Sequence, residues 1–133
     1  MFLLDTDVIS SMRRPSRNPK VMDWLRSVPE KDLFISAVSL GELTRVVSRQ
    51  ETINPAFAND LKSWLGRTEI FFDARVLPFD AAVAKVWGNL TAQPGNFSHD
   101  LMIAATALGY GATMVTRNVR HFAPTGVEIV NPF

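Results

Sequence analysis

Three acidic residues, far apart in the chain, have the surroundings that metal-dependent chemistry needs. Asp5 follows a short apolar run, Glu42 lies about one turn into the helix expected after a second apolar run, and Asp100 lies in the first turn of an apolar helix. Clustered carboxylates repel each other, and a bound divalent cation removes that cost. Oxygen ligands favour a hard ion, Mg²⁺ or Mn²⁺. Such an ion would activate and position a water molecule for attack on a phosphodiester.

Each acid also has an ordinary structural explanation. Asp5 could cap the helix that follows it, Glu42 could pair with Arg45, and Asp100 could complement a helix dipole. These explanations weaken together, because all three acids are expected at one edge of a sheet with few cations nearby. Asp7, the second acid of "FLLDTDVIS", has no such partners. We interpret it as the cap of a short helix over residues 8–12, or as support for the site.

Short apolar runs alternate with amphipathic stretches along the chain. We expect strands over 2–4, 33–36, 75–79, 112–116 and 127–130, and helices over 8–12, 19–28, 38–50, 55–68, 81–90 and 98–110. The runs are continuously apolar, which favours a mostly parallel sheet covered on both faces, an α/β fold. The core stripe expected for helix 38–50 is Leu40, Leu43, Val46 and Val47.

Ligands of an open parallel sheet bind beyond the carboxyl ends of its strands. Besides Asp5, the polar residues expected at that edge are Thr6, Ser36, Thr116, Arg117 and Asn118. Basic residues cluster in the sequence at Arg13, Arg14, Arg17 and Lys20, at Arg45 and Arg49, and at Arg117 and Arg120. Arginine matches phosphate geometry well, so Arg13, Arg14, Arg17 and Arg117 are candidates for contacting a nucleic-acid backbone, although a solvated surface would use the same residues.

The composition is that of an ordinary globular domain, and a length of 133 residues predicts one domain over 1–133. The chain has no cysteine, which excludes disulfides, thiolate nucleophiles and Cys-ligated zinc, and its net charge is +1. No apolar run reaches the ~18 residues that span a membrane, and the N-terminus lacks a basic region of the signal-peptide type. We therefore expect a cytoplasmic protein that does not enter membranes.

The segment "DTDV" is similar to the start of haloacid dehalogenase-like phosphatases, in which the first Asp is phosphorylated. The rest of the chain does not fit that family. It has no later acidic pair after a strand and no well-placed lysine, and it is short for that fold.

Four segments in the same order resemble the PIN domain, most closely the VapC-type toxins of toxin–antitoxin systems, including the FitB-like branch. They are "LLDTDVIS", "ISAVSLGELTRVV", "HDLMIAATALGYGATMVTRNVRHF" and "GVEIVNPF". The resemblance implies an α/β/α sandwich and a metal-dependent endoribonuclease, with Asp5, Glu42 and Asp100 as its acids and Thr6, Thr116 and Asn118 in support. It also implies a homodimer and a small VapB-type antitoxin.

One position departs from the family pattern. Many relatives carry an acid just before the position of Phe122, where this chain has His121. We therefore expect one Mg²⁺ held by Asp5 and Asp100, with Glu42 acting through water. The same departure leaves a second hypothesis open, a catalytically weak PIN domain that binds RNA or a partner protein without cutting RNA.

Overall fold

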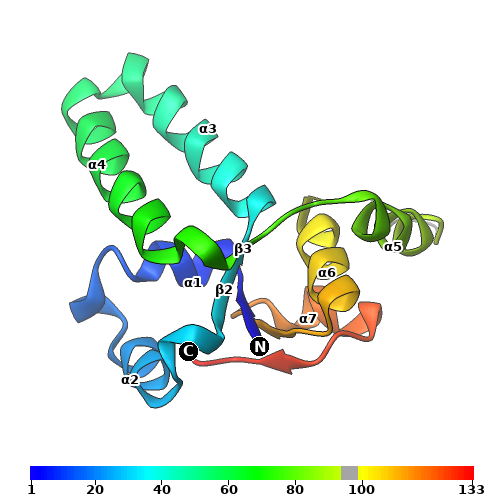
Figure 1. Cartoon of the computed structure of the whole chain (residues 1–133). Helices are drawn as coiled ribbons and strands as arrows, with labels where there is room; N and C mark the ends of the chain where they lie inside the picture. Colours follow the sequence, from blue (N-terminus) through cyan, green and yellow to red (C-terminus); the bar gives the residue numbers. More distant parts are fainter. Residues whose placement is uncertain (94–98) are drawn as a thin grey trace.

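The protein alternates short strands with helices (Figure 1), and the structure, a computed structural model, describes residues 1–93 and 99–133, with the side chains of 99 and 100 excepted. The strands are β1 (Phe2–Leu4), β2 (Leu33–Ser36), β3 (Val76–Leu77), β4 (Thr113–Val115) and β5 (Ile129–Val130). The helices are α1 (Thr6–Ser11), α2 (Pro19–Ser27), α3 (Ala37–Ile53), α4 (Pro55–Phe72), α5 (Ala81–Thr91), α6 (His99–Tyr110) and α7 (Val119–Phe122). Short 3₁₀ turns are η1 (Pro15–Arg17), η2 (Glu30–Asp32), η3 (Asp73–Arg75) and η4 (Ala123–Thr125).

The described strands form one parallel sheet in the order β3-β2-β1-β4-β5. In the central strand, Leu4 pairs with Ile35 of β2 on one side and with Val115 of β4 on the other. Since all strands run in the same direction, their carboxyl ends lie at one edge, and the residues that follow β1, β2 and β4 meet there. The predicted α/β/α fold with a parallel central sheet is confirmed.

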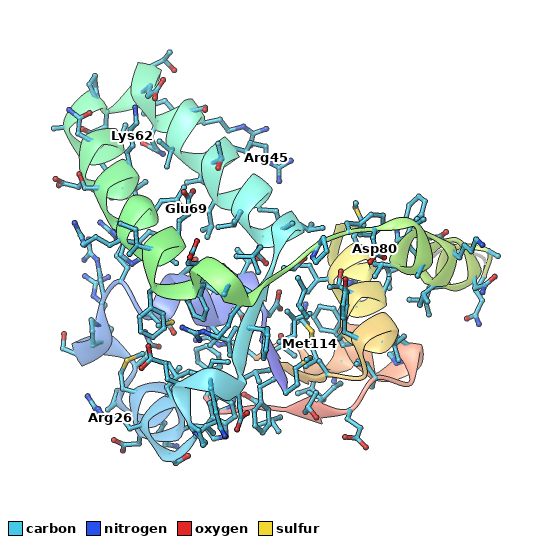
Figure 2. All side chains as sticks on the ribbon, in the orientation of Figure 1. Arg26, Arg45, Lys62, Glu69, Asp80 and Met114 are labelled. Carbon is cyan, nitrogen blue, oxygen red and sulfur yellow. The ribbon has the colours of Figure 1, made fainter. Side chains whose placement is uncertain are left out.

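Both faces of the sheet are buried, which explains why the strands are continuously apolar. Successive side chains of β1 point to opposite faces. Leu4 packs in a cluster with α1–α4, whereas Leu3 packs with Ile103 of α6 and Phe122 of α7. Met114 of β4 lies in this second cluster, between the sheet and α6 (Figure 2).

Helices α3 and α4 form a long antiparallel hairpin that projects from the sheet (Figure 1). Leu43 and Val47 of α3 are buried as predicted, and Leu40 packs against the same cluster. Val46 is 46% exposed, so its assignment to the core stripe was wrong. A helix buries positions four apart more reliably than their immediate neighbours, and Val46 lies on the side of α3 that faces solvent.

Helix α5 packs against α6 at the outside of the molecule. The approach is close: a Cβ atom on Gly109 would lie 3.1 Å from Cγ2 of Val83. A polar link joins the same two helices, since the Tyr110 hydroxyl donates to Asp80 Oδ2 at 2.9 Å. Asp80, which is labelled in Figure 2, also accepts from the Val83 N–H through Oδ1 at 3.0 Å, and this hydrogen bond caps α5.

Arg75 ties the end of α4 to the segment that enters β2. Its Nη1 donates to the carbonyls of Glu30 and Leu33, each at 2.7 Å, and Nη2 donates to the carbonyl of Phe71. The guanidinium also lies 5.0 Å from the ring centroid of Phe72. One side chain with 17% exposure therefore holds two backbone segments together through three of their carbonyls.

Replacement of Arg75 should therefore destabilise the fold. We expect Arg75→Ala to lower the free energy of unfolding by about 2–4 kcal/mol, because three carbonyls lose a charged donor. Arg26→Ala is the matched control, since Arg26 pairs with exposed Asp23 and its side chain is 73% exposed. Urea denaturation at pH 7 measures both. Equal losses in the two variants would contradict the role given to Arg75.

The Asp80–Tyr110 link should make stability depend on pH at both extremes. The hydrogen bond from Val83 N–H, and then that from Tyr110, lowers the pKa of Asp80 below its ordinary 3.8. Its contribution is thus complete above pH 3.8 and is lost as the pH falls through the lowered pKa. The hydrogen bond to Asp80 raises the pKa of Tyr110 above 10.0, so the hydroxyl contributes fully below pH 10.0 and is lost above its raised pKa.

Asp80→Asn keeps a capping oxygen but does not titrate. The difference in unfolding free energy between wild type and Asp80→Asn should be largest near pH 7 and should close as Asp80 becomes protonated. In Tyr110→Phe, a carboxyl carbon-13 NMR titration should show the Asp80 pKa moving back toward 3.8. An Asp80 pKa that is the same in wild type and Tyr110→Phe would rule out the link.

Candidate active site

Asp5 is a buried carboxylate fixed at the carboxyl end of the central strand. It is 6% exposed, and its backbone N–H continues the sheet by donating to Val115 O at 2.9 Å. Oδ1 accepts from the N–H of Thr6 at 2.8 Å, and Oδ2 accepts from the hydroxyl of Thr116 at 2.8 Å. These two hydrogen bonds orient the carboxylate at the carboxyl edge of the sheet.

Thr116 connects Asp5 to the loop after β4. Its N–H donates to Val130 O of β5 at 3.0 Å, which fixes its backbone. Its hydroxyl hydrogen points to Asp5, and the same oxygen accepts from Asn118 N–H at 2.9 Å. Asn118 thus joins the network through its backbone. Thr116 and Asn118, which were predicted to support the site, are brought next to Asp5 by these two bonds.

Asp7 also holds this loop, although its predicted role as a helix cap was wrong. Helix α1 begins at Thr6, and its N-cap is Asp5, so the capping explanation for Asp5 holds alongside its place in the site. Asp7 lies in the first turn of α1, and its Oδ2 accepts from the N–H of Arg117 at 3.2 Å. The alternative interpretation of Asp7, as support for the site, fits this hydrogen bond.

A serine that the sequence reasoning missed links α1 to α3. The hydroxyls of Thr6 and Ser39 lie 2.9 Å apart, and Ser39 is fully buried. Ser36 caps the start of α3 by accepting from Val38 N–H at 3.0 Å. Ser39 precedes Glu42 by three residues, so the two share a face of α3. A small polar residue one turn before an acid, inside an otherwise apolar stripe, is the signal that would have found it.

Glu42 lies on α3 beside the start of α6. Its Oε1 is buried, and the side chain lines a cavity of about 270 Å³ together with Arg45 and with Met102 of α6. Arg45 projects from α3 on the side away from α4 (Figure 2). Since Met102 lines this cavity, the first turn of α6, which carries Asp100, begins beside Glu42. The side chain of Asp100 itself lies outside the described residues.

The oxygens present fit a hard divalent cation. Two of the groups that donate to Asp5 are a backbone amide and a hydroxyl, and both are uncharged donors that orient the carboxylate. Among the described side chains, which omit Asp100, no group of three or more His, Asp or Glu could hold a metal ion. His121 lies in α7 with its ring 5.3 Å from that of Phe122.

The residues around this edge match a known family. The sequence pattern of the PIN domain matches residues 2–126. The chain belongs to the PIN-domain family.

None of the helices within 1–93 and 99–133 is long and apolar enough to cross a membrane.

Relatives of this PIN domain match it over its whole length. Toxin FitB of Neisseria gonorrhoeae is 32% identical over 100% of this chain and 99% of its own. The VapC ribonuclease Y4jK of Sinorhizobium fredii is 30% identical over 100% of this chain and 98% of its own. The crystal structure of FitAcB from Neisseria gonorrhoeae superposes with a TM-score of 0.88 at 33% identity, covering 99% of this chain and 98% of that one.

Thr116 should be the residue on which the position of Asp5 depends. Thr116→Val keeps the shape but removes the donor to a buried carboxylate, so we expect a loss of about 1.5–3 kcal/mol in unfolding free energy. Thr116→Ser keeps the hydroxyl and should lose only about 1 kcal/mol for the methyl group. Thr44→Val is the control, because Thr44 is exposed and its hydroxyl donates to Leu40 O of its own helix. If urea denaturation gives the same loss for Val and Ser at position 116, Asp5 does not depend on this hydroxyl.

Proposed function

We propose that this PIN domain, spanning residues 1–133, is a metal-dependent endoribonuclease and the toxin of a VapBC-type toxin–antitoxin module. The observation that carries the proposal is the buried carboxylate of Asp5, held at the carboxyl edge of the sheet by Thr6 and Thr116. Full-length similarity to a VapC ribonuclease and to Toxin FitB supports the same activity. An RNA phosphodiester is the substrate.

Asp5 and Asp100 are the proposed ligands of Mg²⁺, and Glu42 takes part through a water molecule; Mn²⁺ fits the same oxygens. When bound, the ion lowers the pKa of a water molecule and offsets the charge that builds on the phosphate oxygens. Asp5 suits this role because its two hydrogen bonds fix the direction of both carboxylate oxygens before any ligand arrives. Such preorganisation avoids reorientation during the reaction.

Individual side chains of the protein have separate roles in the hydrolysis. Glu42 orients the attacking water and accepts its proton while the water oxygen bonds to phosphorus. The bond between phosphorus and the leaving ribose oxygen breaks, and that oxygen takes up a proton from solvent. Thr116 holds Asp5 and, through the Asn118 N–H, holds the loop after β4 against the site. Ser39 fixes the start of α3, and with it Glu42, against α1.

The partners follow from the toxin assignment. A ribonuclease toxin has to be restrained, and we propose a VapB-type antitoxin that blocks the acidic edge. We also propose a homodimer that acts in the cytoplasm, where RNA is present. Similarity to Toxin FitB over the whole chain supports the assignment to a toxin.

A second candidate function is binding without cleavage. It is favoured by His121, which stands where many relatives carry a further acid and which packs against Phe122 in α7. With fewer acids, the site would hold metal more weakly. Toxicity on expression that persists in Asp100→Ala would favour this function, whereas toxicity that requires Asp100 would exclude it.

Removing one carboxylate should abolish cleavage while leaving the fold intact. We expect Asp5→Asn and Glu42→Gln to lower the rate of RNA cleavage about 10²-fold to 10⁴-fold, because the first removes a ligand of the metal ion and the second removes the group that accepts the proton of the attacking water. Glu51→Gln is the matched control, since Glu51 is an exposed acid on the same helix as Glu42. It should cleave like the wild type.

Cleavage-site mapping on total RNA with Mg²⁺, with Mn²⁺ and with a chelator measures all three variants. The proposal requires cleavage that needs a divalent ion and disappears in Asp5→Asn. Wild-type protein that cleaves no RNA with either ion, or an Asp5→Asn variant that cuts at the same positions, would refute it.

A further inference from the structure

An open cavity lined by arginine adjoins the acidic site. It has a volume of about 410 Å³, and its lining includes Arg13, Arg14, Arg17 and Arg117, with Asp7 at one side. A second cavity of about 270 Å³ shares Arg17, Asn18, Arg117 and Phe133 with the first and continues to Lys20 at the start of α2. We call these two adjoining cavities the arginine groove. The groove runs from the first turn of α1, across η1, to the first turn of α2.

The arginine groove begins next to the residues that hold Asp5. Arg117 directly follows Thr116, whose hydroxyl donates to Asp5. The N–H of Arg117 donates to Asp7 Oδ2, which fixes the start of the groove against α1. A polymer with its reacting bond at Asp5 therefore has Arg117 within its reach on one side of that bond.

The groove concentrates positive charge in a chain that is almost neutral overall. Among the described residues, the side chains around it include four arginines and Lys20 but one acidic side chain, that of Asp7, whereas the net charge of the whole chain is +1. The ion pairs Arg26–Asp23 and Arg75–Glu30 both lie outside the groove. The excess of cationic side chains in the lining of the groove suits an anionic ligand.

Two of the arginines are held in place by aromatic rings. The guanidinium carbon of Arg117 lies 4.1 Å from the ring centroid of Phe133, and that of Arg13 lies 5.0 Å from the ring centroid of Phe57. Contact with the face of a ring leaves the N–H groups at the edge of the guanidinium free to donate. Because the side chains are already ordered, less rotamer entropy is lost when a phosphate binds.

We infer that the arginine groove binds successive phosphates of single-stranded RNA on one side of the bond to be cut. The inference rests on the proposed function, because it takes Asp5 as the place of reaction. An RNA strand fits better than an acidic protein segment: the groove is continuous with the catalytic edge, and bidentate guanidinium groups match phosphate oxygens. A repeating backbone charge also suits arginines spread over two adjoining cavities.

The test measures binding separately from cleavage. A fluorescein-labelled single-stranded oligouridylate is titrated with the full chain in buffer containing a chelator, and fluorescence anisotropy gives Kd at several salt concentrations. Arg14→Ala, Arg17→Ala and Arg117→Ala should each raise Kd about threefold to tenfold. The slope of log Kd against log salt should fall by about 0.7 for each phosphate that the variant no longer neutralises.

Arg49→Ala is the matched control, because Arg49 is exposed near the far end of α3 and lines neither cavity of the groove. It removes the same charge and should leave Kd and the salt slope unchanged. In steady-state cleavage with Mg²⁺, the groove variants should raise KM and keep kcat, because the arginines bind the backbone equally in the ground and transition states. Arg17→Gln removes the charge but keeps a polar side chain. It should also raise Kd, which would show that the effect of Arg17→Ala does not come from a folding defect.

The outcomes separate this inference from the proposed function. If the wild type cleaves RNA and the groove variants bind the oligouridylate as the wild type does, the groove has no role and the nuclease assignment stands. If the wild type neither binds nor cleaves RNA, the proposed function fails and the inference fails with it. If the variants keep their Kd for RNA but no longer bind a poly-glutamate peptide that the wild type binds, the groove is a protein-docking surface and the inference is overturned.

Discussion

The hydrogen bond from Thr116 to Asp5 joins residues 111 positions apart, and the rest of the site is arranged around it. A carboxylate with 6% exposure needs hydrogen-bond donors to remain charged inside a protein. A parallel sheet can supply these hydrogen-bond donors, because neighbouring strands end at the same edge and each places one polar residue there. Asp5 from β1 and Thr116 from β4 meet for this reason, with Ser39 added by the helix after β2.

The sequence was sufficient for the fold because continuously apolar strands occur only where both faces of a sheet are covered. It also identified Asp5, Thr116 and Asn118 as neighbours, since strand ends are visible as the last apolar residue before a polar one. The residue at which α1 begins was harder to predict from the sequence. Asp5 and Asp7 flank one threonine, and only the backbone decides that α1 begins at Thr6 and leaves Asp7 in its first turn.

Other features could not be predicted because they depend on tertiary packing. Ser39 has an ordinary helix position, and its partner, Thr6, lies 33 residues away. Helix α7 has four residues, too few for a periodic pattern, and its N-cap residue, Asn118, is held by the hydrogen bond from its N–H to the Thr116 hydroxyl. The exposure of Val46 depends on which side of the α3–α4 hairpin meets the sheet, and an amphipathic stripe defines that side only to within one residue.

The carboxylates of the acidic edge and the arginines of the groove lie in separate but adjoining places. Carboxylates that suit a cation also repel RNA, and a net charge of +1 gives almost no general attraction for a polyanion. Placing Arg117 immediately after Thr116 puts attraction one residue away from the hydroxyl that orients Asp5. Its backbone N–H bonds to Asp7 and its guanidinium stacks on Phe133, so the same loop that positions the acid also positions the cation. In the proposed function, affinity for the RNA backbone and reactivity at the phosphate would both depend on neighbouring residues of one short segment, and a partner that blocks both would have to cover the loop after β4.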